Sequence, residues 1–345
     1  MRRTIMKLEK CPLNPILKPN PKNAWESLCV LNPAVIYDED RQEFAMLYRA
    51  AGNDEEHRIY LGLATSKDGI HFQRMSDAPA LAPDIDGPDG GGIEDPRIFR
   101  LGDAYFLTYA SRPFAPGQYW LKDHKDFVAY TQFGPMGYNR NDTQTHLAFS
   151  KDLRHWKKLG RISDAHDDDR DVILLPKKIN GRFYRFSRPM GRCGEGYPNK
   201  NPAIWISSSD DMLQFNEPIS LFYQGKLWWE DAKVGASTPM IETEDGWLMI
   251  YHGVNKKDGA YRVGAFLLDK ENPAKILYQF KEPILEPTED YETKGYYNGC
   301  VFPTGNLVKD GLLYVYYGAA DHFIGLATFP IDELLKKLKE EPYEE

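Results

Sequence analysis

The sequence lacks the features that would direct it to a membrane, to nucleic acid or to a disulfide framework. No apolar window of about 18 residues occurs, so we expect no transmembrane helix. The net charge is −8 without a long basic run, which argues against nucleic acid or an anionic membrane as the main partner. The basic N-terminus has no apolar signal-peptide run. Four scattered cysteines without a C-x-x-C motif favour reduced thiols and a cytoplasmic protein.

Signatures of metal and nucleotide chemistry are missing as well. The histidines lack the spacing of metal ligands, and no Gly-Lys-Ser/Thr phosphate loop is present. Cys193 has no neighbouring base motif that would activate it as a nucleophile. We therefore expect neither a metal nor an organic cofactor.

What the chain does contain is one pattern repeated five times. With 42% apolar and 13% aromatic residues, its composition is globular. Each unit reads strand, Gly/Asp turn, aromatic-rich strand, loop, strand, and Asn-Gly or Asp-Gly turns mark the hairpins. The units span roughly 32–90, 91–165, 166–225, 230–290 and 295–330. This repetition predicts one all-β domain over 1–345, a five-bladed β-propeller, with a β-sandwich as the alternative.

The two ends of the chain are expected to differ from this pattern. Residues 1–30 predict an N-terminal extension with a strand that closes the fold. Pro330 precedes apolar residues spaced by three and four, which predicts a C-terminal helix within 331–345.

The stretch 90–97 carries the first candidate for chemistry. Three glycines lead into Glu94, Asp95, Pro96 and Arg97 at the start of a strand. A carboxylate held at a strand entrance is a candidate general acid, with Arg97 facing the same side two residues later. The alternative is a turn capped by Asp95 and neutralised by its own Arg97.

Superposing the five units predicts that polar residues from all of them meet at one end of the central axis. The predicted equivalent first-strand positions are Asn32, Asp95, Arg170, Lys233 and Asn298, and the second-strand positions are Arg49, Ala110, Arg188, His252 and Gly318. So many cations near one carboxylate suit an oxyanion with several acceptor oxygens, most simply phosphate. The alternative is an internal salt network with Glu94, Asp171 and Asp231.

Aromatic residues in loops form a second set of candidates, because aromatic rings stack on the C–H faces of sugars. These residues are Tyr119, Trp120, Tyr138, Trp228, Trp229, Tyr291, Tyr296 and Tyr297. Ordinary packing within the fold is the alternative for most of them.

Several motifs together resemble glycoside hydrolase family 130, five-bladed propeller enzymes that include β-mannoside phosphorylases and some β-mannosidases. The motifs are Gly-Ile-Glu-Asp-Pro-Arg (92–97), Leu-Leu-Pro-Lys-Lys-Ile-Asn-Gly-Arg-Phe (174–183), Ser-Arg-Pro (187–189), Lys-Val-Gly (233–235), Gly-Trp-Leu-Met-Ile-Tyr-His-Gly-Val (246–254) and Tyr-Tyr-Gly-Ala-Ala-Asp (316–321). The resemblance runs from about residue 32 to residue 321.

The resemblance implies a role for each matching residue. Asp95 matches the proton donor, which acts through the mannose 3-hydroxyl. The phosphate-contacting positions match Arg170, Arg188, Lys233, His252 and Tyr261, and the mannose-holding positions match Asn32, Arg49 and Asp321. We also expect Glu94 and Arg97 at the substrate site. The implied reaction is inverting phosphorolysis of a β-mannoside by inorganic phosphate, which gives α-mannose 1-phosphate.

The sequence does not identify the sugar that is released, and it does not exclude other activities. The freed part could be glucose, N-acetylglucosamine or a β-mannooligosaccharide, and the loop 114–145 could cap the pocket. A β-mannosidase acting on β-1,2- or β-1,4-mannosides remains an alternative, with a base from Glu94, Glu195, Glu230 or Glu286. A non-catalytic glycan-binding propeller is a further alternative, and exposed loops could support a homo-oligomer.

Overall fold

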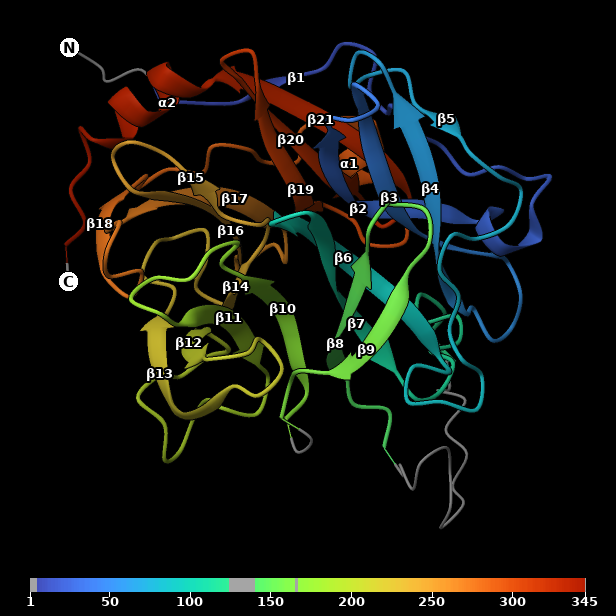
Figure 1. Cartoon of the computed structure of the whole chain (residues 1–345), viewed down its shortest axis with the longest axis horizontal. Helices are drawn as coiled ribbons and strands as arrows, with labels where there is room; N and C mark the ends of the chain where they lie inside the picture. Colours follow the sequence, from blue (N-terminus) through green and yellow to red (C-terminus); the bar gives the residue numbers. More distant parts are fainter. Residues whose placement is uncertain (1–4, 124–139, 165–166, 345) are drawn as a thin grey trace.

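The computed structural model describes residues 5–123, 140–164 and 167–344, and it consists almost entirely of β-strands (Figure 1). Two short α-helices, α1 (Asp290–Thr293) and α2 (Ile331–Leu338), and one 3₁₀ turn (Ala24–Glu26) are the helical elements of these residues. The predicted all-β class and C-terminal helix are confirmed. No helix in the described ranges is both long and apolar enough to cross a bilayer.

The strands form five antiparallel groups in chain order. The first contains β2 (Cys29–Asp38), β3 (Glu43–Ala51), β4 (Ile59–Ser66) and β5 (Gln73–Arg74), and the second β6 (Gly92–Leu101), β7 (Ala104–Arg112), β8 (Gln144–Ser150) and β9 (Lys157–Arg161). The third contains β10 (Asp169–Leu174), β11 (Phe183–Pro189), β12 (Ile204–Ser209) and β13 (Asn216–Tyr223). The fourth contains β14 (Lys233–Ala236), β15 (Ile241–Glu242), β16 (Trp247–Val254), β17 (Tyr261–Leu268) and β18 (Ile276–Gln279). The fifth contains β19 (Val301–Lys309), β20 (Leu312–Ala319), β21 (Phe323–Pro330) and β1 (Glu9–Lys10). These groups match the five predicted units, although a parallel pair between Ile59 and Gly92 links the first two into one sheet.

The fifth group is built from both ends of the chain. Glu9 pairs with Thr328 and Lys10 with Ala327, so β1 becomes the outer neighbour of β21. Asn14 reinforces this closure because its side chain donates to the carbonyl of Leu326 and accepts from the amide of Leu326, each at 2.8 Å. The closing strand that the sequence predicted is therefore present.

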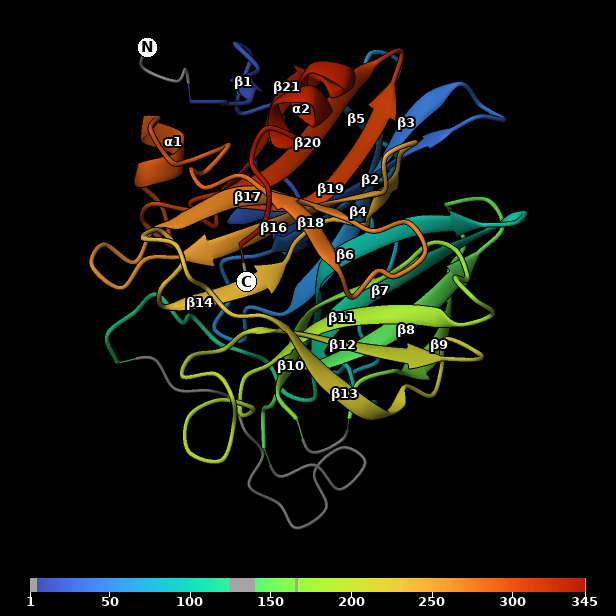
Figure 2. The ribbon, with the colours of Figure 1, turned by 90° about the vertical axis from the view of Figure 1, so that its left-hand side faces the viewer.

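Apolar side chains fill the spaces between neighbouring groups. Between the fourth and fifth groups, Leu248 and Val315 belong to one buried cluster, which α2 covers with Leu334 and Leu338 (Figure 2). Fully burying a leucine side chain stabilises the fold by about 1.5–3 kcal/mol. The apolar spacing of α2 thus fixes which of its faces packs on the strands.

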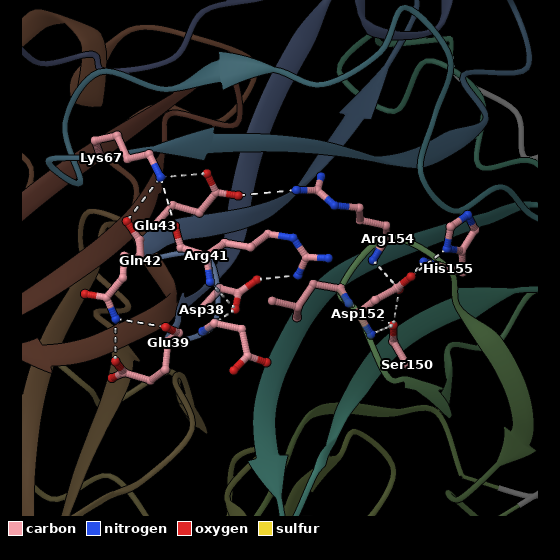
Figure 3. A network of polar contacts seen from close by, with 12 residues as sticks. Asp38, Glu39, Arg41, Gln42, Glu43, Lys67, Ser150, Asp152, Arg154 and His155 are labelled. Carbon is pink, nitrogen blue, oxygen red and sulfur yellow. Dashed lines mark hydrogen bonds and ion pairs between the residues drawn. The ribbon is translucent and has the colours of Figure 1, made fainter.

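One polar turn recurs in four groups, after β4, β8, β12 and β17. In the second group, Asp152 Oδ1 accepts the backbone N–H groups of Arg154 and His155, each at 2.9 Å (Figure 3). Asp68, Asp211 and Asp269 repeat this arrangement in the first, third and fourth groups. An aspartate that satisfies its own turn in this way stabilises the local backbone without a long-range partner.

A carboxylate on β3 cross-links the first two groups near these turns. Glu43 Oε2 lies 3.3 Å from Lys67 Nζ, and Glu43 Oε1 lies 3.3 Å from Arg154 Nη2 (Figure 3). The network joins the turn after β4 to the turn after β8. Exposed ion pairs of this kind each contribute little to stability, about 0–1 kcal/mol. We therefore assign this network a role in aligning the first two strand groups.

Candidate active site

All five strand groups contribute to one cavity of about 330 Å³. Nine of the eleven predicted site residues line it: Asn32, Arg49, Glu94, Asp95, Arg170, Arg188, Lys233, Tyr261 and Asp321. The remaining two, Arg97 and His252, are buried and do not line it. Residues up to 289 positions apart in the chain therefore meet at one place, as the superposition of units predicted.

A repeated β-bulge presents side chains to this cavity. In β6 the pairing with β7 breaks between Glu94 and Arg97, and Asp95 takes a left-handed φ of 51°. The same break occurs in β2, where Asn32 has φ 43°, and in β10, where Asp171 has φ 54°. A bulge re-aims the side chain of its extra residue, and Asn and Asp tolerate the left-handed region best. The three bulged residues all line the cavity.

The strand register corrects the predicted set of first-strand equivalents. The residues that pair are Leu31 with Arg49, Glu94 with Ala110, Arg170 with Arg188, Gly235 with His252, and Phe302 with Gly318. The second-strand set is thus confirmed. In the first strands, Asp171 and not Arg170 is the equivalent of Asn32 and Asp95, and Lys233 lies two residues before the position opposite His252. Which residues are equivalent is decided by pairing between strands, which a superposition of the sequence alone cannot detect.

Two further expectations from that superposition are wrong. Asn298 does not line the cavity, and its Oδ1 accepts the backbone N–H of Gly295 at 3.1 Å. Asp95 is also not the single acidic member of the set, because Asp171 occupies an equivalent bulge. The acidic residues that line the cavity therefore come from three groups: the second (Glu94 and Asp95), the third (Asp171) and the fifth (Asp321).

Asp95 is held by residues of the first group. Asn32 Nδ2 donates to Asp95 Oδ1 at 2.6 Å, and Arg49 Nη1 donates to the same atom at 2.8 Å. Arg97 contacts the backbone carbonyl of Asp95 at 2.8 Å, and its ion pair is with Asp171 instead. The hypothesis that Asp95 is neutralised by its own Arg97 is therefore wrong, because the bulge turns the two side chains apart.

Glu94 lies beside Asp95 between two arginines. Its Oε2 lies 2.8 Å from Arg49 Nη1, and its Oε1 accepts Arg112 Nε at 3.0 Å. Burial alone would raise the pKa of Glu94, but Arg49 and Arg112 outweigh it and lower the pKa to about 2. Glu94 is thus an ionised anchor for both arginines.

The cationic residues predicted to bind phosphate differ in whether a carboxylate pairs with them. Arg170 makes a two-pronged contact with Asp168 at 2.9 and 3.0 Å. Lys233 has no carboxylate oxygen within 4 Å among the residues described, and its ammonium lies 4.8 Å from the centre of the Tyr261 ring. Burial, with Arg188 adding to it, lowers the pKa of Lys233 to about 8. A buried cation without a counter-ion is suited to receive an anionic ligand.

The internal salt network, the alternative to a ligand site, is present only in part. Glu94 and Asp171 pair with cavity arginines. Asp231 instead accepts the backbone N–H of Lys256 at 2.8 Å and does not line the cavity. The network therefore does not neutralise the positive charge of Lys233.

His252 lies behind the cavity wall. Its Nδ1 is 2.9 Å from Ser237 Oγ. Its Nε2 is 3.4 Å from Asp171 Oδ2 and has no hydrogen-bond partner in the part of the chain that the structure describes. Burial lowers the pKa of His252 to about 4, against the opposing effect of Asp171, so the ring is neutral near pH 7. Direct contact between His252 and phosphate stays a prediction.

Asp321 closes the cavity from the fifth group. It adopts φ 53°, and its Oδ2 accepts the hydroxyl of Tyr119 at 3.2 Å. Burial raises the pKa of Asp321. Pro116 and Tyr119 also line the cavity, so part of the loop 114–145 does border the site. Tyr138 and the rest of 124–139 lie outside the described residues.

Sequence reasoning missed part of the lining. The lining residues that it did not name are Ile59, Arg112, Pro116, Cys300 and Phe302, and it named Asp171 only as a member of the alternative salt network. Tyr119 and Tyr297, two of the loop aromatics proposed to stack on sugars, also line it, whereas Trp229 is fully buried in an apolar cluster. The signal for Asp171 was its place next to Arg170, and Arg112 is separated by one residue from Ala110, which was already in the superposed set.

Only one of the four glutamates considered as a hydrolytic base lines the cavity, namely Glu94. Glu230 is buried elsewhere and accepts the hydroxyls of Tyr223 and Tyr251. Glu286 pairs with Lys7 at 2.6 Å, and Glu195 is exposed. The hypothesis that Glu195, Glu230 or Glu286 acts as a base at this cavity is therefore wrong.

Comparison with known proteins agrees with this geometry. Residues 7–340 match the model of glycoside hydrolase family 130, described as β-1,4-mannooligosaccharide phosphorylase. Two relatives from Thermoanaerobacter sp. (strain X514) are each 35% identical over 335 residues. They are a 1,2-β-oligomannan phosphorylase (96% of this chain, 99% of the relative) and a β-1,2-mannobiose phosphorylase (94% and 97%). The solved β-1,2-mannobiose phosphorylase from Listeria innocua, in complex with β-1,2-mannobiose, superposes with a TM-score of 0.76 at 25% identity, covering 97% of this chain and 100% of that one. The chain therefore belongs to glycoside hydrolase family 130.

Proposed function

We propose that this chain is an inverting β-mannoside phosphorylase that transfers a mannosyl group to inorganic phosphate and releases α-mannose 1-phosphate. The observation that carries this proposal is a single cavity that holds both Asp95 and the cations Arg170, Arg188 and Lys233. Phosphate is already a nucleophile, so the site needs cations to bind and aim it and one acid to assist the departing sugar. The curated relatives, which bear phosphorylase names, support the same reaction.

In the proposed reaction a phosphate oxygen attacks the anomeric carbon on the face opposite the glycosidic oxygen. The C–O bond to the leaving sugar breaks, and its electron pair stays on the glycosidic oxygen. The proton that this oxygen needs comes from Asp95 and passes through the mannose 3-hydroxyl. Asn32 and Arg49 hold the Asp95 carboxyl in place throughout.

The remaining predicted residues bind the two substrates in this proposal. Mannose is held by Asn32, Arg49, Glu94 and Asp321, and phosphate by Arg170, Arg188, Lys233 and Tyr261, with His252 behind them. Arginine presents planar pairs of donors to phosphate, whereas Lys233 supplies a point charge. Arg97 acts on the site through the carbonyl of Asp95.

Two observations favour phosphorolysis over hydrolysis. Inverting hydrolysis needs a second carboxylate that removes a proton from water. Glu94, the candidate from the sequence that lines the cavity, has a pKa of about 2 and is occupied by Arg49 and Arg112, which makes it a weak base. Lys233 by contrast lacks a carboxylate partner in the part of the chain that the structure describes, as an anion site requires.

We also propose that the five strand groups are the blades of a five-bladed β-propeller. β2 contacts both β6 and β19, and β10 contacts β14, so first strands of neighbouring groups adjoin. A central cavity lined from all five groups is what convergence of these strands would produce. In this proposal the enzyme works in the cytoplasm without a metal or organic cofactor.

For the substrate we propose β-1,2-linked mannooligosaccharides. Both relatives at 35% identity are named for β-1,2-linked mannosides, whereas the family model is described by a β-1,4 activity. The aromatic rings of Tyr119 and Tyr297 at the cavity provide stacking surfaces for sugar rings.

The test is to incubate the enzyme with β-1,2-mannobiose and with β-1,4-mannobiose, each with and without inorganic phosphate. We expect a phosphate ester, detected by phosphorus NMR, whose anomeric proton has the α configuration, and more of it from the β-1,2 substrate. Free mannose at the same rate without phosphate would identify a hydrolase. Binding of mannobiose without turnover under any condition would identify a glycan-binding protein.

A further inference from the structure

We propose that Asp171 is a positioning residue. It connects the cations that bind phosphate to the backbone of the proton donor Asp95. The inference rests on the proposed phosphorylase function and deepens it. Only 3% of the Asp171 side chain is exposed, and it sits in the wall of the cavity. Its two carboxylate oxygens face different parts of the site.

The Oδ2 atom of Asp171 faces the phosphate-binding part. It accepts Arg188 Nε at 2.7 Å and lies 2.5 Å from Arg188 Nη2. The third nitrogen of Arg188 donates to the sulfur of Met190 at 2.9 Å. With all three nitrogens contacted, the guanidinium plane has one orientation, and its remaining N–H bonds are available on the side that lines the cavity.

The Oδ1 atom of Asp171 faces the proton donor through Arg97. Arg97 Nη2 lies 3.2 Å from Asp171 Oδ1, Arg97 Nη1 donates to the carbonyl of Asp95 at 2.8 Å, and Arg97 Nε donates to the carbonyl of Ser237 at 2.9 Å. Arg97 is buried and uses its nitrogens on these partners. It supports the left-handed backbone of Asp95, which costs free energy unless its surroundings fix it.

The neighbouring strand leaves room for this carboxylate. A Cβ atom on Gly235 would lie 2.3 Å from Asp171 Oδ2 and 2.5 Å from His252 Cε1. Asp171 also occupies the same bulge position as Asn32 and Asp95. The same type of β-bulge therefore directs three polar side chains to the cavity. An aspartate is required here because an amide offers one acceptor oxygen, whereas Arg97 and Arg188 are both buried cations that need a counter-charge.

The experiment compares the kinetics of Asp171→Asn with those of a matched control. We expect the phosphate KM of Asp171→Asn to rise about tenfold or more and kcat to fall about tenfold or more, because charged hydrogen bonds on both sides are lost. The mannoside KM should stay within about twofold. A purely structural role would lower only the fraction of active enzyme and leave both KM values unchanged.

Asp169→Asn is the matched control. Asp169 lies two residues away on β10, is also buried, and does not line the cavity. Among the described residues, its Oδ1 atom has no hydrogen-bond partner. The kinetic constants of this variant should equal those of the wild type.

Arg97→Lys tests the connection to Asp95. Because it keeps a positive charge beside Asp171, it also serves as the second variant if Asp171→Asn does not fold. One ammonium cannot reach the partners of three guanidinium nitrogens, so kcat should fall while the phosphate KM stays within about twofold. The kcat losses of Arg97→Lys and Asp171→Asn should not add in the double variant, because both act through one connection.

The outcomes separate the inference from the proposed function. An unchanged phosphate KM in folded Asp171→Asn, or additive kcat losses in the double variant, overturns the positioning role. If Asp171→Asn does not fold, an unchanged kcat in Arg97→Lys overturns it. A wild-type enzyme that makes no mannose 1-phosphate refutes the proposed function instead, and in that case inorganic phosphate would give no thermal stabilisation of the wild type.

Discussion

Arg49 donates to the carboxylate of Asp95 across 2.8 Å, although the two residues stand 46 positions apart on strands of different groups. The same nitrogen lies 2.8 Å from Glu94. One arginine of the first group therefore fixes two neighbouring carboxylates of the second. This contact holds the proposed proton donor in place at the cavity.

Replacing Asp95 by Asn should abolish most of the activity. The amide keeps the size of the side chain but cannot supply a proton, and loss of a general acid costs about 10²–10⁴-fold in rate. We expect kcat for phosphorolysis to fall by that factor with a thermal midpoint close to that of the wild type. A variant that keeps more than about a tenth of wild-type kcat would remove Asp95 from the donor role.

Replacing Lys233 by Ala should weaken the use of phosphate specifically. Lys233 has no carboxylate partner within the described ranges, so its removal leaves no unpaired buried anion. We expect the phosphate KM to rise about tenfold or more, with the mannoside KM within about twofold. Steady-state kinetics at varied phosphate and fixed mannoside measure the change. Lys226→Ala, on a lysine outside the cavity, serves as the control.

The affinity for phosphate should fall as the pH rises through about 8. The pKa of Lys233 is about 8 in the folded protein, so the ammonium is present below that pH and is lost above it. The expected result is a phosphate KM that rises above pH 8 in the wild type. The Lys233→Ala variant should lack this alkaline limb, and an identical limb in both proteins would contradict the assignment.

The sign of the stability change with pH is opposite to that of the phosphate affinity. Because the pKa of Lys233 is lower in the folded than in the unfolded chain, the unfolded chain binds more protons above about pH 8. The contribution of Lys233 to the free energy of unfolding therefore increases with pH in that range. Comparing urea unfolding of the wild type and Lys233→Ala between pH 7 and pH 10 would isolate this contribution.

Replacing Gly235 by Ala should damage both stability and activity. The added Cβ would lie 2.3 Å from Asp171 Oδ2, so Asp171 or His252 must move. We expect about 1–3 kcal/mol of destabilisation, typical of overpacking, and a higher phosphate KM. Gly191→Ala is the control, because no atom of the described residues lies within 4 Å of a Cβ at Gly191. Equal melting temperatures for the two variants would contradict the crowding at Gly235.

Replacing Glu230 by Gln should lower stability without removing activity. Glu230 accepts hydrogen bonds from Tyr223 and Tyr251 in a buried site away from the cavity. Loss of the charged acceptor should lower the free energy of unfolding by about 1–3 kcal/mol. The kcat of the folded enzyme should be unchanged, and a large loss of kcat at full folding would restore Glu230 as a catalytic candidate.

Much of the fold was predictable because its signals are local. Asn-Gly and Asp-Gly turns and alternating apolar residues mark the hairpins, and the spacing of Leu334, Leu335 and Leu338 marks α2. The second-strand residues Arg49, Arg188 and His252 were also aligned correctly, because where a bulge occurs beside them its extra residue lies on the first strand and not on the second. Of the first-strand residues, Asn32 and Asp95 were aligned correctly, whereas Arg170 lies one residue before the equivalent Asp171 and Lys233 two residues before the partner of His252. Pairing across a sheet fixes these equivalences, and a single strand does not show it.

By itself, the sequence determined the all-β class, the five repeated units and most of the side chains that line the cavity, because strand periodicity and turn chemistry are properties of neighbouring residues. Only the tertiary structure decided which charges are neutralised. Asp171 pairs with Arg97 and Arg188, Glu94 pairs with Arg49 and Arg112, and Lys233 has no carboxylate partner among the described residues. Ion pairing depends on distances of a few ångström between strands far apart in the chain, and those distances arise only when the five groups pack together.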